Sequence, residues 1–288
     1  MSYDLPNDEK VKICADFIQT GPPGQFTDVY NDVRALLGDD ELLKDTAPAA
    51  AKLHRDSFLS VELPEENGKP AVRAMVTPHG NTIDSCYLEP RTQRTFSFNP
   101  ISRLVESIEA AEINTDEDAE ACRQAIQTAV DEYVEQYYVD GTSTVYCKQE
   151  GGCNIYTVCI ESHKFSLANF WCGMWTSEYF ISTENGSAEI RGKIKMRVHY
   201  FEDANIQLQA GKDVNETISS SSTDDLADKV GKYLLKCEGT YQSAVNENYI
   251  AMAGDCFKSL RRALPITKSK LDWGKIASYR VGDEISKK

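Results

Sequence analysis

The stretch TSEYFISTENGSAEIRGKIKMRVHYF, residues 176–201, predicts two strands joined by a tight turn. Asn185 and Gly186 stand between the two strand-like runs, and this pair supplies the positive φ angles that a tight hairpin needs. Similar short turns join TSTVYCKQ to NIYTVCIES upstream, and EDAN leads into IQLQA downstream. Because consecutive strands with such short turns can only be antiparallel, residues 141–212 predict a five-stranded antiparallel sheet.

Upstream of this sheet, the chain predicts a helical stalk, a small β unit and one further helix. Residues 1–58 hold three apolar stretches with helical spacing, separated by breaks such as the sequence GPPG at 21–24. Residues 59–115 hold short β-like runs broken by Pro and Gly, and we expect a short helix at 101–114 within this unit. Residues 116–140 repeat apolar side chains every three or four positions, which predicts a helix. The fold class is therefore α+β.

Residues 219–264 predict a single helix that covers the sheet. Nine apolar side chains between Leu226 and Cys256 recur every three or four positions. At about 1.5 Å per residue, these roughly thirty positions extend about 45 Å, which is more than one five-stranded sheet needs as cover. Such an apolar stripe needs packing along its whole length. A partner subunit under the same helix would provide that packing.

The C-terminal end carries a charge opposite to that of the rest of the chain. The whole chain has a formal net charge of −14. Residues 257–288, called here the basic segment, hold nine Lys/Arg and three Asp/Glu, so the segment carries +6 and the remainder −20. Pro265 ends the long helix and can begin a second, amphipathic one, which makes residues 265–288 a C-terminal tail. A basic amphipathic helix suits an acidic partner with an apolar groove, although a core-packing helix or a solvated end is also open.

No arrangement of residues in the sequence predicts catalysis or a metal centre. The four histidines are scattered, and no phosphate-binding loop, nucleophile elbow or dinucleotide fingerprint occurs. Five possible zinc ligands lie close together in sequence, but their spacing suits buried thiols on strands better than a zinc site; they are Cys147, Cys153, Cys159, His163 and Cys172. We therefore expect a protein that is not an enzyme and that has no cofactor and no metal.

Several stretches resemble the alpha subunit of F-actin-capping protein, the heterodimer that closes the barbed ends of actin filaments. FKSLRRALP at 257–265 matches the family's F-K-x-L-R-R-x-L-P signature, and VHYFEDANI at 198–206 is close to V-H-Y-[YF]-E-D-G-N-V. Further likeness lies in PPGQFTDVYNDVRALL, ESHKFSLANFWCGMWTSEY and LPITKSKLDWGKIASYR, so the similarity covers nearly the whole chain in order. The chain departs from the family at Ala204, where the family has Gly, and at Ile206, where it has Val. An alanine disfavours a positive-φ turn, so this loop is expected to differ slightly.

The resemblance implies an obligate heterodimer subunit. Its sheet joins the sheet of a beta subunit, long helices cover the joint sheet, and the C-terminal tail projects toward actin. The implied function is calcium-independent capping of barbed ends in the cytoplasm and cytoskeleton. By resemblance, Lys258, Arg262 and Lys268 align with basic positions implicated in barbed-end binding. The amphipathic pattern of the tail region adds Arg261, Lys270, Leu271, Trp273 and Ile276.

The resemblance also implies partners beyond actin and the beta subunit. These are phosphoinositides and regulators of capping protein, such as myotrophin-like and CARMIL-like proteins. Nucleic acid is not expected, because the body of the chain is acidic and offers no basic sheet face. One alternative function uses the same tail, that of an adaptor that binds phosphoinositides, a membrane surface or calmodulin.

Overall fold

The structure is a computed structural model of the 288-residue chain. It describes residues 5–44, 46–52, 54, 58–66, 68–82, 85–111, 116–184, 186–202 and 205–251. The chain divides into two compact units, Met1–Glu238 and Gly239–Lys288. The second unit is described only as far as Ala251, so the account below concerns the first unit unless it says otherwise.

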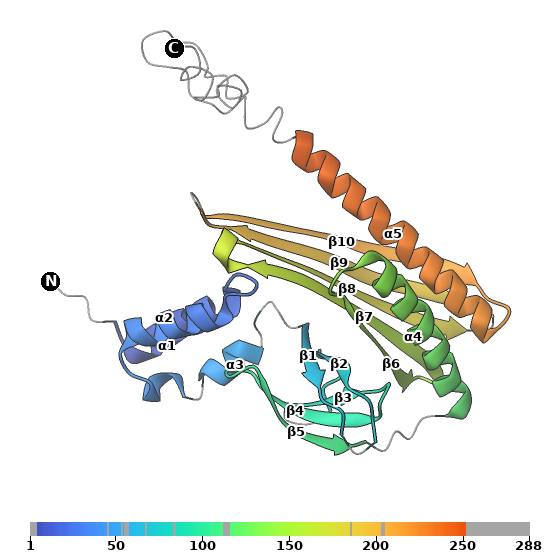
Figure 1. Ribbon diagram of the computed structural model, residues 1–288, viewed down its shortest axis with the longest axis horizontal. Helices are drawn as coiled ribbons and strands as arrows, with labels where there is room; N and C mark the ends of the chain where they lie inside the picture. Colours follow the sequence, from blue (N-terminus) through green and yellow to red (C-terminus); the bar gives the residue numbers. More distant parts are fainter. Residues whose placement is uncertain are drawn as a thin grey trace, which may run out of the picture. The chain divides into compact units, whose positions relative to one another are not determined.

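Three α-helices open the described part of the chain (Figure 1). They are α1 (Asn7–Thr20), α2 (Phe26–Leu37) and α3 (Thr46–Lys52), with a 3-10 turn, η1, at Glu41–Leu43. The left-handed backbone of Gly38, with φ 68°, ends α2 and lets its N–H bond to the carbonyl of Arg34. The apolar stripes of these helices meet in a core of their own, whose largest buried members are Ile18, Phe26 and Leu43.

A small β unit follows these helices. Its strands are β1 (Leu59–Leu63), β2 (Val72–Val76), β3 (Cys86–Glu89), β4 (Arg94–Asn99) and β5 (Leu104–Ala110). They form a two-stranded sheet, β1-β2, and a three-stranded sheet, β3-β4-β5, and both sheets are antiparallel. Phe96 and Phe98 of β4 are buried in the core between them.

The prediction of a helix at 101–114 is wrong, because the middle of this stretch forms strand β5. Val105 pairs with Phe98 and Ile108 pairs with Phe96, and the register shifts between Ser97 and Phe98. The shift leaves one extra residue in β5, so two apolar side chains three positions apart face the same core. An interval of three is also typical of a helix, so the β-bulge gives this part of the sequence a helix-like spacing of apolar residues.

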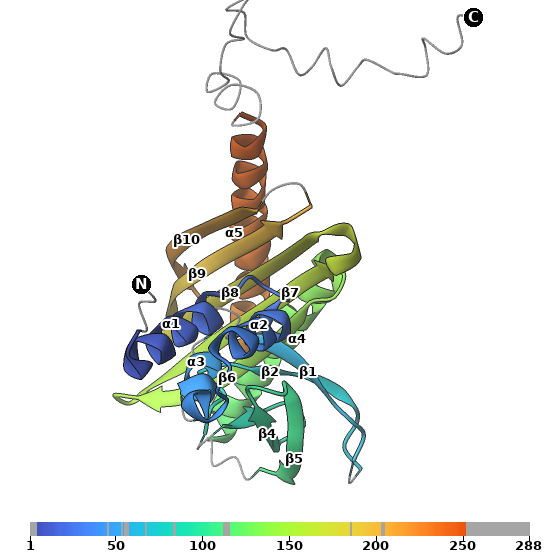
Figure 2. The same cartoon turned by 90° about the vertical axis from the view of Figure 1, so that its left-hand side faces the viewer.

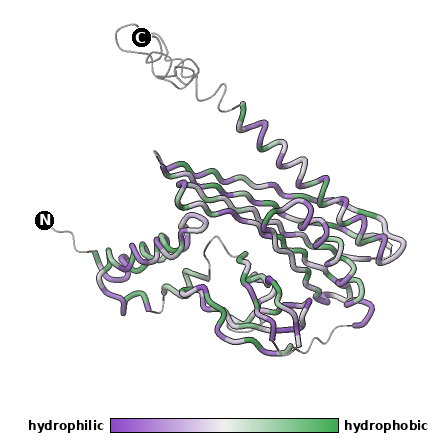
Figure 3. The backbone as a smooth tube through the Cα atoms, in the orientation of Figure 1, coloured by the Kyte–Doolittle hydropathy of each residue, from purple (hydrophilic) through white to green (hydrophobic). Residues whose placement is uncertain are grey.

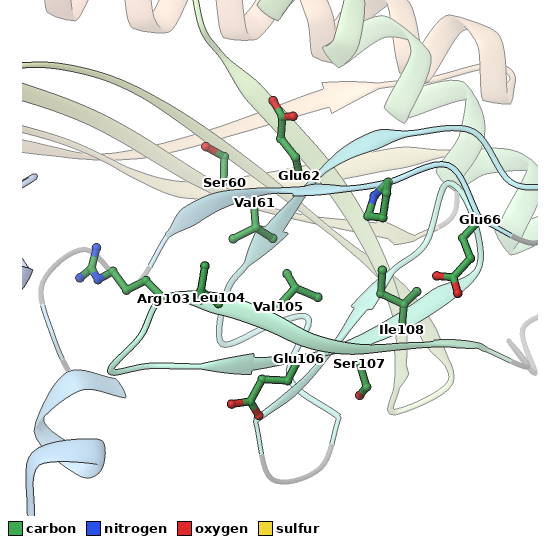
Figure 4. A pocket seen from close by; sticks show the side chains of 11 residues that line it. Ser60, Val61, Glu62, Glu66, Arg103, Leu104, Val105, Glu106, Ser107 and Ile108 are labelled. Atoms are coloured by element: carbon green, nitrogen blue, oxygen red, sulfur yellow. The ribbon is translucent and has the colours of Figure 1, made fainter.

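Figure 4 shows a groove of about 680 Å³ along the seam between β1 and β5. Val61 of β1 points toward Val105 and Ile108 of β5, while Glu62 and Glu106 point away from the seam (Figure 4). The lining contains no histidine and no cysteine. The groove therefore marks the junction of the two small sheets, where Val61, Val105 and Ile108 pack against their shared core.

The large sheet confirms the predicted five-stranded antiparallel meander. After α4 (Glu117–Tyr137) come β6 (Thr142–Glu150), β7 (Cys153–Ser166), β8 (Trp171–Glu184), β9 (Ser187–Tyr200) and β10 (Ile206–Ser219), with a 3-10 turn, η2 (Leu167–Asn169), between β7 and β8. The strands lie in the order β10-β9-β8-β7-β6, and each neighbouring pair is antiparallel. Gly186, with φ 79°, turns β8 into β9. The predicted range of 141–212 ended too early, because β10 continues to Ser219 through a mostly polar stretch.

The two faces of the sheet have different cover. Figures 1 and 2 place α4 and the first turns of α5 (Thr223–Ala251) on one face, and α1, α2 and the small β unit on the other. Directly paired residues share a face, so Val158, Tyr179 and Gly192 form one row on the helix side. Figure 3 shows hydrophobic and hydrophilic residues alternating along these strands. Within the described residues, none of the helices has the length and apolar content that crossing a membrane requires.

Candidate functional site

The eight residues predicted to bind actin all lie outside the part of the chain that the structure describes. They are Lys258, Arg261, Arg262, Lys268, Lys270, Leu271, Trp273 and Ile276. The long helix predicted at 219–264 is described from Thr223 to Ala251, and Ser222 Oγ accepts the N–H of Asp225 at 3.2 Å as its N-cap. The candidate site that can be built from the described residues is the sheet with its two edges.

The β6 edge of the sheet is sealed at Val145 by side chains of α4. The outward N–H of Val145 donates to Gln127 Oε1 at 2.7 Å, and the carbonyl of Val145 accepts from Arg123 Nη1 at 3.3 Å. Glu120 holds the Arg123 guanidinium with two contacts of 2.7 and 2.8 Å. Gln127 and Arg123 are both buried. An edge whose backbone groups already have partners cannot accept another strand there.

The β10 edge has less cover among the described residues, where Lys229 Nζ of α5 donates to the carbonyl of Ser219 at the end of the strand, at 2.8 Å. β10 is 14 residues long, and its backbone pairs only with β9 in the described part of the chain. Its odd-numbered residues from Gln207 to Ser219 are all exposed, whereas most even-numbered ones are half-buried. Ile206, at the start of the strand, is 55% exposed. A long exposed edge presents a row of backbone donors and acceptors to any strand that can align with it.

Helix α5 lies over the half-buried face of β10. Burial raises the pKa of the Tyr233 phenol, and the charge of Glu216 on β10 raises it further. Burial likewise raises the pKa of the Cys237 thiol, while Lys212 on β10 opposes that rise. Val214 also pairs directly with Gly192, which pairs with Tyr179, and the Tyr179 hydroxyl donates to Glu238 of α5. The even-numbered side chains of β10 therefore form the side of the edge that faces the helix.

A buried carboxylate anchors α5 to α4 and to the sheet. Glu238 of α5 is 1% exposed and accepts hydrogen bonds from three tyrosine hydroxyls. The Oη–Oε distance is 2.7 Å for Tyr133 of α4 and for Tyr179 of β8, and Tyr138, just after α4, is the third donor. Burial, and next the charge of Glu238, raises the pKa of all three phenols, so each hydroxyl keeps its proton. This cluster fixes the position of α5 above β8.

Sequence reasoning missed Glu238, although the sequence carries a signal for it. Leu234 and Tyr241 belong to the apolar stripe of α5, and both are buried. Glu238 lies four positions after Leu234 and three positions before Tyr241, so it occupies the same side of the helix. A charged residue within an apolar stripe needs several hydrogen-bond partners when it is buried.

Two of the stretches that carry the family resemblance meet at one end of the sheet. Gln25, from the break between α1 and α2, contacts His199 Nδ1 of β9 through its Nε2 atom at 2.6 Å. His199 Nε2 contacts Asn205 Oδ1 at 3.0 Å. Both contacts are satisfied when Gln25 donates to Nδ1 and the ring carries its proton on Nε2. The residues Gln25, His199 and Asn205 thus tie the helical stalk to the sheet, while Ala204 lies outside the described residues.

A third such stretch joins the same junction through aromatic rings. Phe165 lies over Gly24, where an added Cβ would be 2.6 Å from the ring and where φ is +77°. Phe170 meets Phe201 edge-to-face at 5.8 Å, and Phe201 stacks on His199 at 4.9 Å. The close approach requires glycine at position 24. The motif residues are therefore explained by a structural junction between the stalk and the sheet.

The structure separates the cysteines that raised the question of zinc. Cys159 and His163 lie on β7, Cys172 lies on β8, and both of these cysteines are buried. His163 bonds instead to Glu161 at 2.6 Å. In the described ranges, no group of three or more His, Cys, Asp or Glu residues could hold a metal ion.

Comparison with known proteins places the chain in a family. A family model described as "F-actin capping protein alpha subunit" matches residues 14–284. The F-actin-capping protein subunit alpha of Caenorhabditis elegans is 35% identical over 288 residues, covering 98% of this chain and 99% of that protein. The protein of the same name from Dictyostelium discoideum is 31% identical over 284 residues, covering 98% and 99%.

A solved structure shares the fold. The homodimeric actin capping protein alpha subunit from Plasmodium berghei superposes with a TM-score of 0.71 at 19% identity, covering 83% of this chain and 92% of that chain. The family model covers the two signature stretches, including the one in the basic segment. On these grounds the chain belongs to the F-actin capping protein alpha subunit family.

Proposed function

We propose that this chain is the alpha subunit of a heterodimer that binds the barbed end of an actin filament and blocks subunit addition and loss there without calcium. The family to which it belongs consists of structural, non-enzymatic proteins that cap actin. The observation that carries the proposal is the open β10 edge, 14 residues long, which contrasts with the sealed β6 edge. We assign the β10 edge to the sheet of a beta subunit, so that the two sheets become one.

Exposed apolar side chains on the helices support the assignment of a partner. Phe17 of α1 and Leu36 of α2 are 57% and 85% exposed. Tyr249 and Ile250, near the described end of α5, are also exposed. Covering such side chains is worth about 25 cal/mol for each Å² of apolar surface removed from water. A beta subunit that covers them would explain why the chain needs a second subunit.

The actin contact is assigned to the basic segment, residues 257–288. Its charge of +6 stands against −20 in the rest of the chain, so it is the part best suited to an acidic surface on actin. Positive charge speeds encounter by steering, and the apolar side of the C-terminal tail then slows dissociation by docking in a groove. With a tail of the beta subunit bound as well, the two attachments act as one bivalent grip.

The test is a double charge reversal in the basic segment. Lys258→Glu with Arg262→Glu is expected to weaken capping strongly in a seeded polymerisation assay, because it replaces two of the cations that meet actin. The heterodimer is expected to stay assembled, since the change lies outside the sheet edge. A matched control reverses two exposed lysines elsewhere, Lys148→Glu with Lys164→Glu, and is expected to cap normally. Equal capping by both double variants would contradict the assignment.

The remaining partners belong to the same proposal. Phosphoinositide headgroups would compete with actin for the cations of the basic segment, because both ligands are anionic. Myotrophin-like and CARMIL-like regulators would act on the assembled heterodimer, which we place in the cytoplasm and on the cytoskeleton. If the chain instead serves as an adaptor, the basic segment would bind anionic vesicles or calmodulin, and the double reversal would weaken that binding.

A further inference from the structure

We infer that the chain has a binding site for a small apolar carboxylate, such as an aromatic acid, in which the guanidinium of Arg103 pairs with the carboxylate group. The site lies where the three opening helices meet the small β unit. It uses none of the residues assigned to actin or to the beta subunit, so it stands apart from the proposed function.

A turn before β5 fixes the direction of the Arg103 side chain. The backbone of Arg103 has a φ of 57°, which is uncommon for a residue with a Cβ. Its N–H donates to the carbonyl of Asn99 at 2.8 Å, and Asn99 Oδ1 accepts the N–H groups of Ile101 and Ser102 at 2.9 and 3.1 Å. Figure 4 shows the side chain extending away from the other residues of the groove. A strained backbone that neighbouring contacts hold in place is frequent at binding sites.

The guanidinium of Arg103 lies beside aromatic rings and not beside a carboxylate. Its Cζ atom is 4.2 Å from the centroid of the buried Phe26 ring, and its Nη2 atom contacts His54 Nδ1 at 3.4 Å. The Nε atom is buried and has no hydrogen-bond partner among the described residues. A guanidinium has five N–H donors, so most of its donor capacity is not used by these contacts.

This environment leaves a partly buried positive charge without a counter-ion. Burial lowers the pKa of Arg103 to about 10, and no carboxylate among the described residues offsets this change. A pKa of about 10 still leaves the guanidinium charged at pH 7. By contrast, Arg123 pairs with Glu120 at 2.7 Å and Arg91 pairs with Glu89 at 2.9 Å. Because a buried charge without a partner is unfavourable, a bound anion would stabilise the protein at Arg103.

A cavity of about 190 Å³ adjoins Arg103 and is mainly apolar. Four strands contribute to it through Leu59, Val76, Tyr87 and Phe98, and Thr77 and Asn81 are polar members of its lining. An apolar cavity of about 150 Å³ is large enough to hold benzene, so an aromatic ring fits here. A carboxylate on that ring would meet Arg103, whose planar fork binds carboxylates through two parallel hydrogen bonds.

The lining favours this ligand over more polar anions. Arg103 is the only positively charged residue of the lining, whereas phosphate carries more charge and more oxygens that need donors. Acetate supplies the carboxylate but leaves the apolar walls without a partner. The C-terminal residue of a peptide also carries a carboxylate, but its amide group would have to be buried against the same apolar walls.

The first test measures the binding of benzoate to the full chain, as purified, by isothermal titration calorimetry. Benzamide has the same shape without the charge, and acetate has the charge without the ring. Each should bind at least about tenfold more weakly than benzoate. N-acetylphenylalanine, which mimics a peptide terminus, should also bind more weakly. No binding of benzoate, equal affinity for benzoate and benzamide, or tighter binding of N-acetylphenylalanine would overturn the inference.

The second test changes the arginine. Arg103→Met removes the charge and keeps an apolar side chain, so it should weaken benzoate binding at least about tenfold and leave benzamide binding unchanged. Arg191→Met, at an exposed arginine of β9, is the matched control and should bind benzoate as the unaltered chain does. Without ligand, Arg103→Met should melt at the same or a higher temperature, because no unpaired buried charge remains. A lower melting temperature with unchanged benzoate binding would show that Arg103 serves only the fold.

The third test locates the ligand in the unaltered chain and therefore does not depend on the folding of a variant. 4-Azidobenzoate, activated by light, should label peptides that contain Leu59, Val76 or Phe98. An excess of benzoate should suppress this labelling, whereas an excess of benzamide should not. Labelling confined to the basic segment would show that its cations hold the carboxylate in place of Arg103, and it would overturn the inference.

Discussion

Replacing Glu238 by alanine removes the acceptor that three tyrosine hydroxyls share. The hydroxyls belong to Tyr133 of α4, to Tyr138 just after α4 and to Tyr179 of β8. The change therefore affects every contact of this cluster at once. A buried donor without a partner costs about 1–3 kcal/mol, which gives roughly 3–9 kcal/mol for three hydroxyls. Relief from burying a charge offsets part of this cost, and we expect the free energy of unfolding to fall by about 3–5 kcal/mol.

Denaturation with urea, followed by circular dichroism, measures this loss in the protein as purified. Glu238→Gln keeps one acceptor oxygen and should lose about half as much, because an amide oxygen can serve two of the three hydroxyls. Glu247→Ala, at an exposed position on α5, is the matched control and should change the free energy of unfolding by less than about 0.5 kcal/mol. If Glu238→Ala behaves like this control, the cluster does not anchor α5.

Three more predictions concern the sheet. The hydrogen bond to Glu161 raises the pKa of His163 above 6.5, so the stabilising effect of this pair is full below pH 6.5 and is lost as the pH rises through the raised pKa. In urea titrations between pH 6 and 8, His163→Gln should therefore lose less stability than the unaltered chain. An equal loss in both proteins would contradict this. Gly192→Ala places a Cβ 2.5 Å from the tyrosine ring of β8 and should lower the melting temperature through about 1–3 kcal/mol of overpacking, whereas Gly173→Ala, with nothing within 4 Å, should not. Gln127→Met unseals the β6 edge and should lower stability by about 1–3 kcal/mol and increase aggregation in light scattering; an unchanged variant would show that the seal is dispensable.

The large sheet could be predicted because its turns are local signals. Gly186 and the glycines at 151 and 152 all have positive φ angles at the ends of hairpins. Each of these turns fixes the direction of the next strand without reference to the rest of the chain. The order of five strands therefore follows from the sequence alone.

The errors arose where distant contacts decide the structure. The bulge between Ser97 and Phe98 changes the spacing of apolar residues in β5, and no residue of β5 itself reveals it. The second half of β10 is mostly polar because its odd-numbered residues are exposed and its even-numbered ones include Lys212 and Glu216, so alternation of hydrophobic residues is weak there. Hydrophobic period alone is a poor guide at an edge strand.

The candidate site divides in the same way. Sequence patterns and family resemblance indicated the basic segment, whose eight binding residues remain a prediction. They did not indicate that Gln127 and Arg123 seal one edge of the sheet, since these contacts join a helix face to a strand backbone. The contrast between the sealed β6 edge and the open β10 edge becomes visible only when the strands are placed side by side.

The central claim is that this chain caps barbed ends as one half of a heterodimer. The most direct measurement is the elongation rate of single filaments from seeds, observed by fluorescence microscopy with the chain and a beta subunit together and with each alone. The account predicts that the complex stops growth at barbed ends while pointed ends continue to grow, and that neither subunit alone does so with comparable affinity. Barbed ends that keep growing at an unchanged rate in the presence of the assembled complex would contradict it.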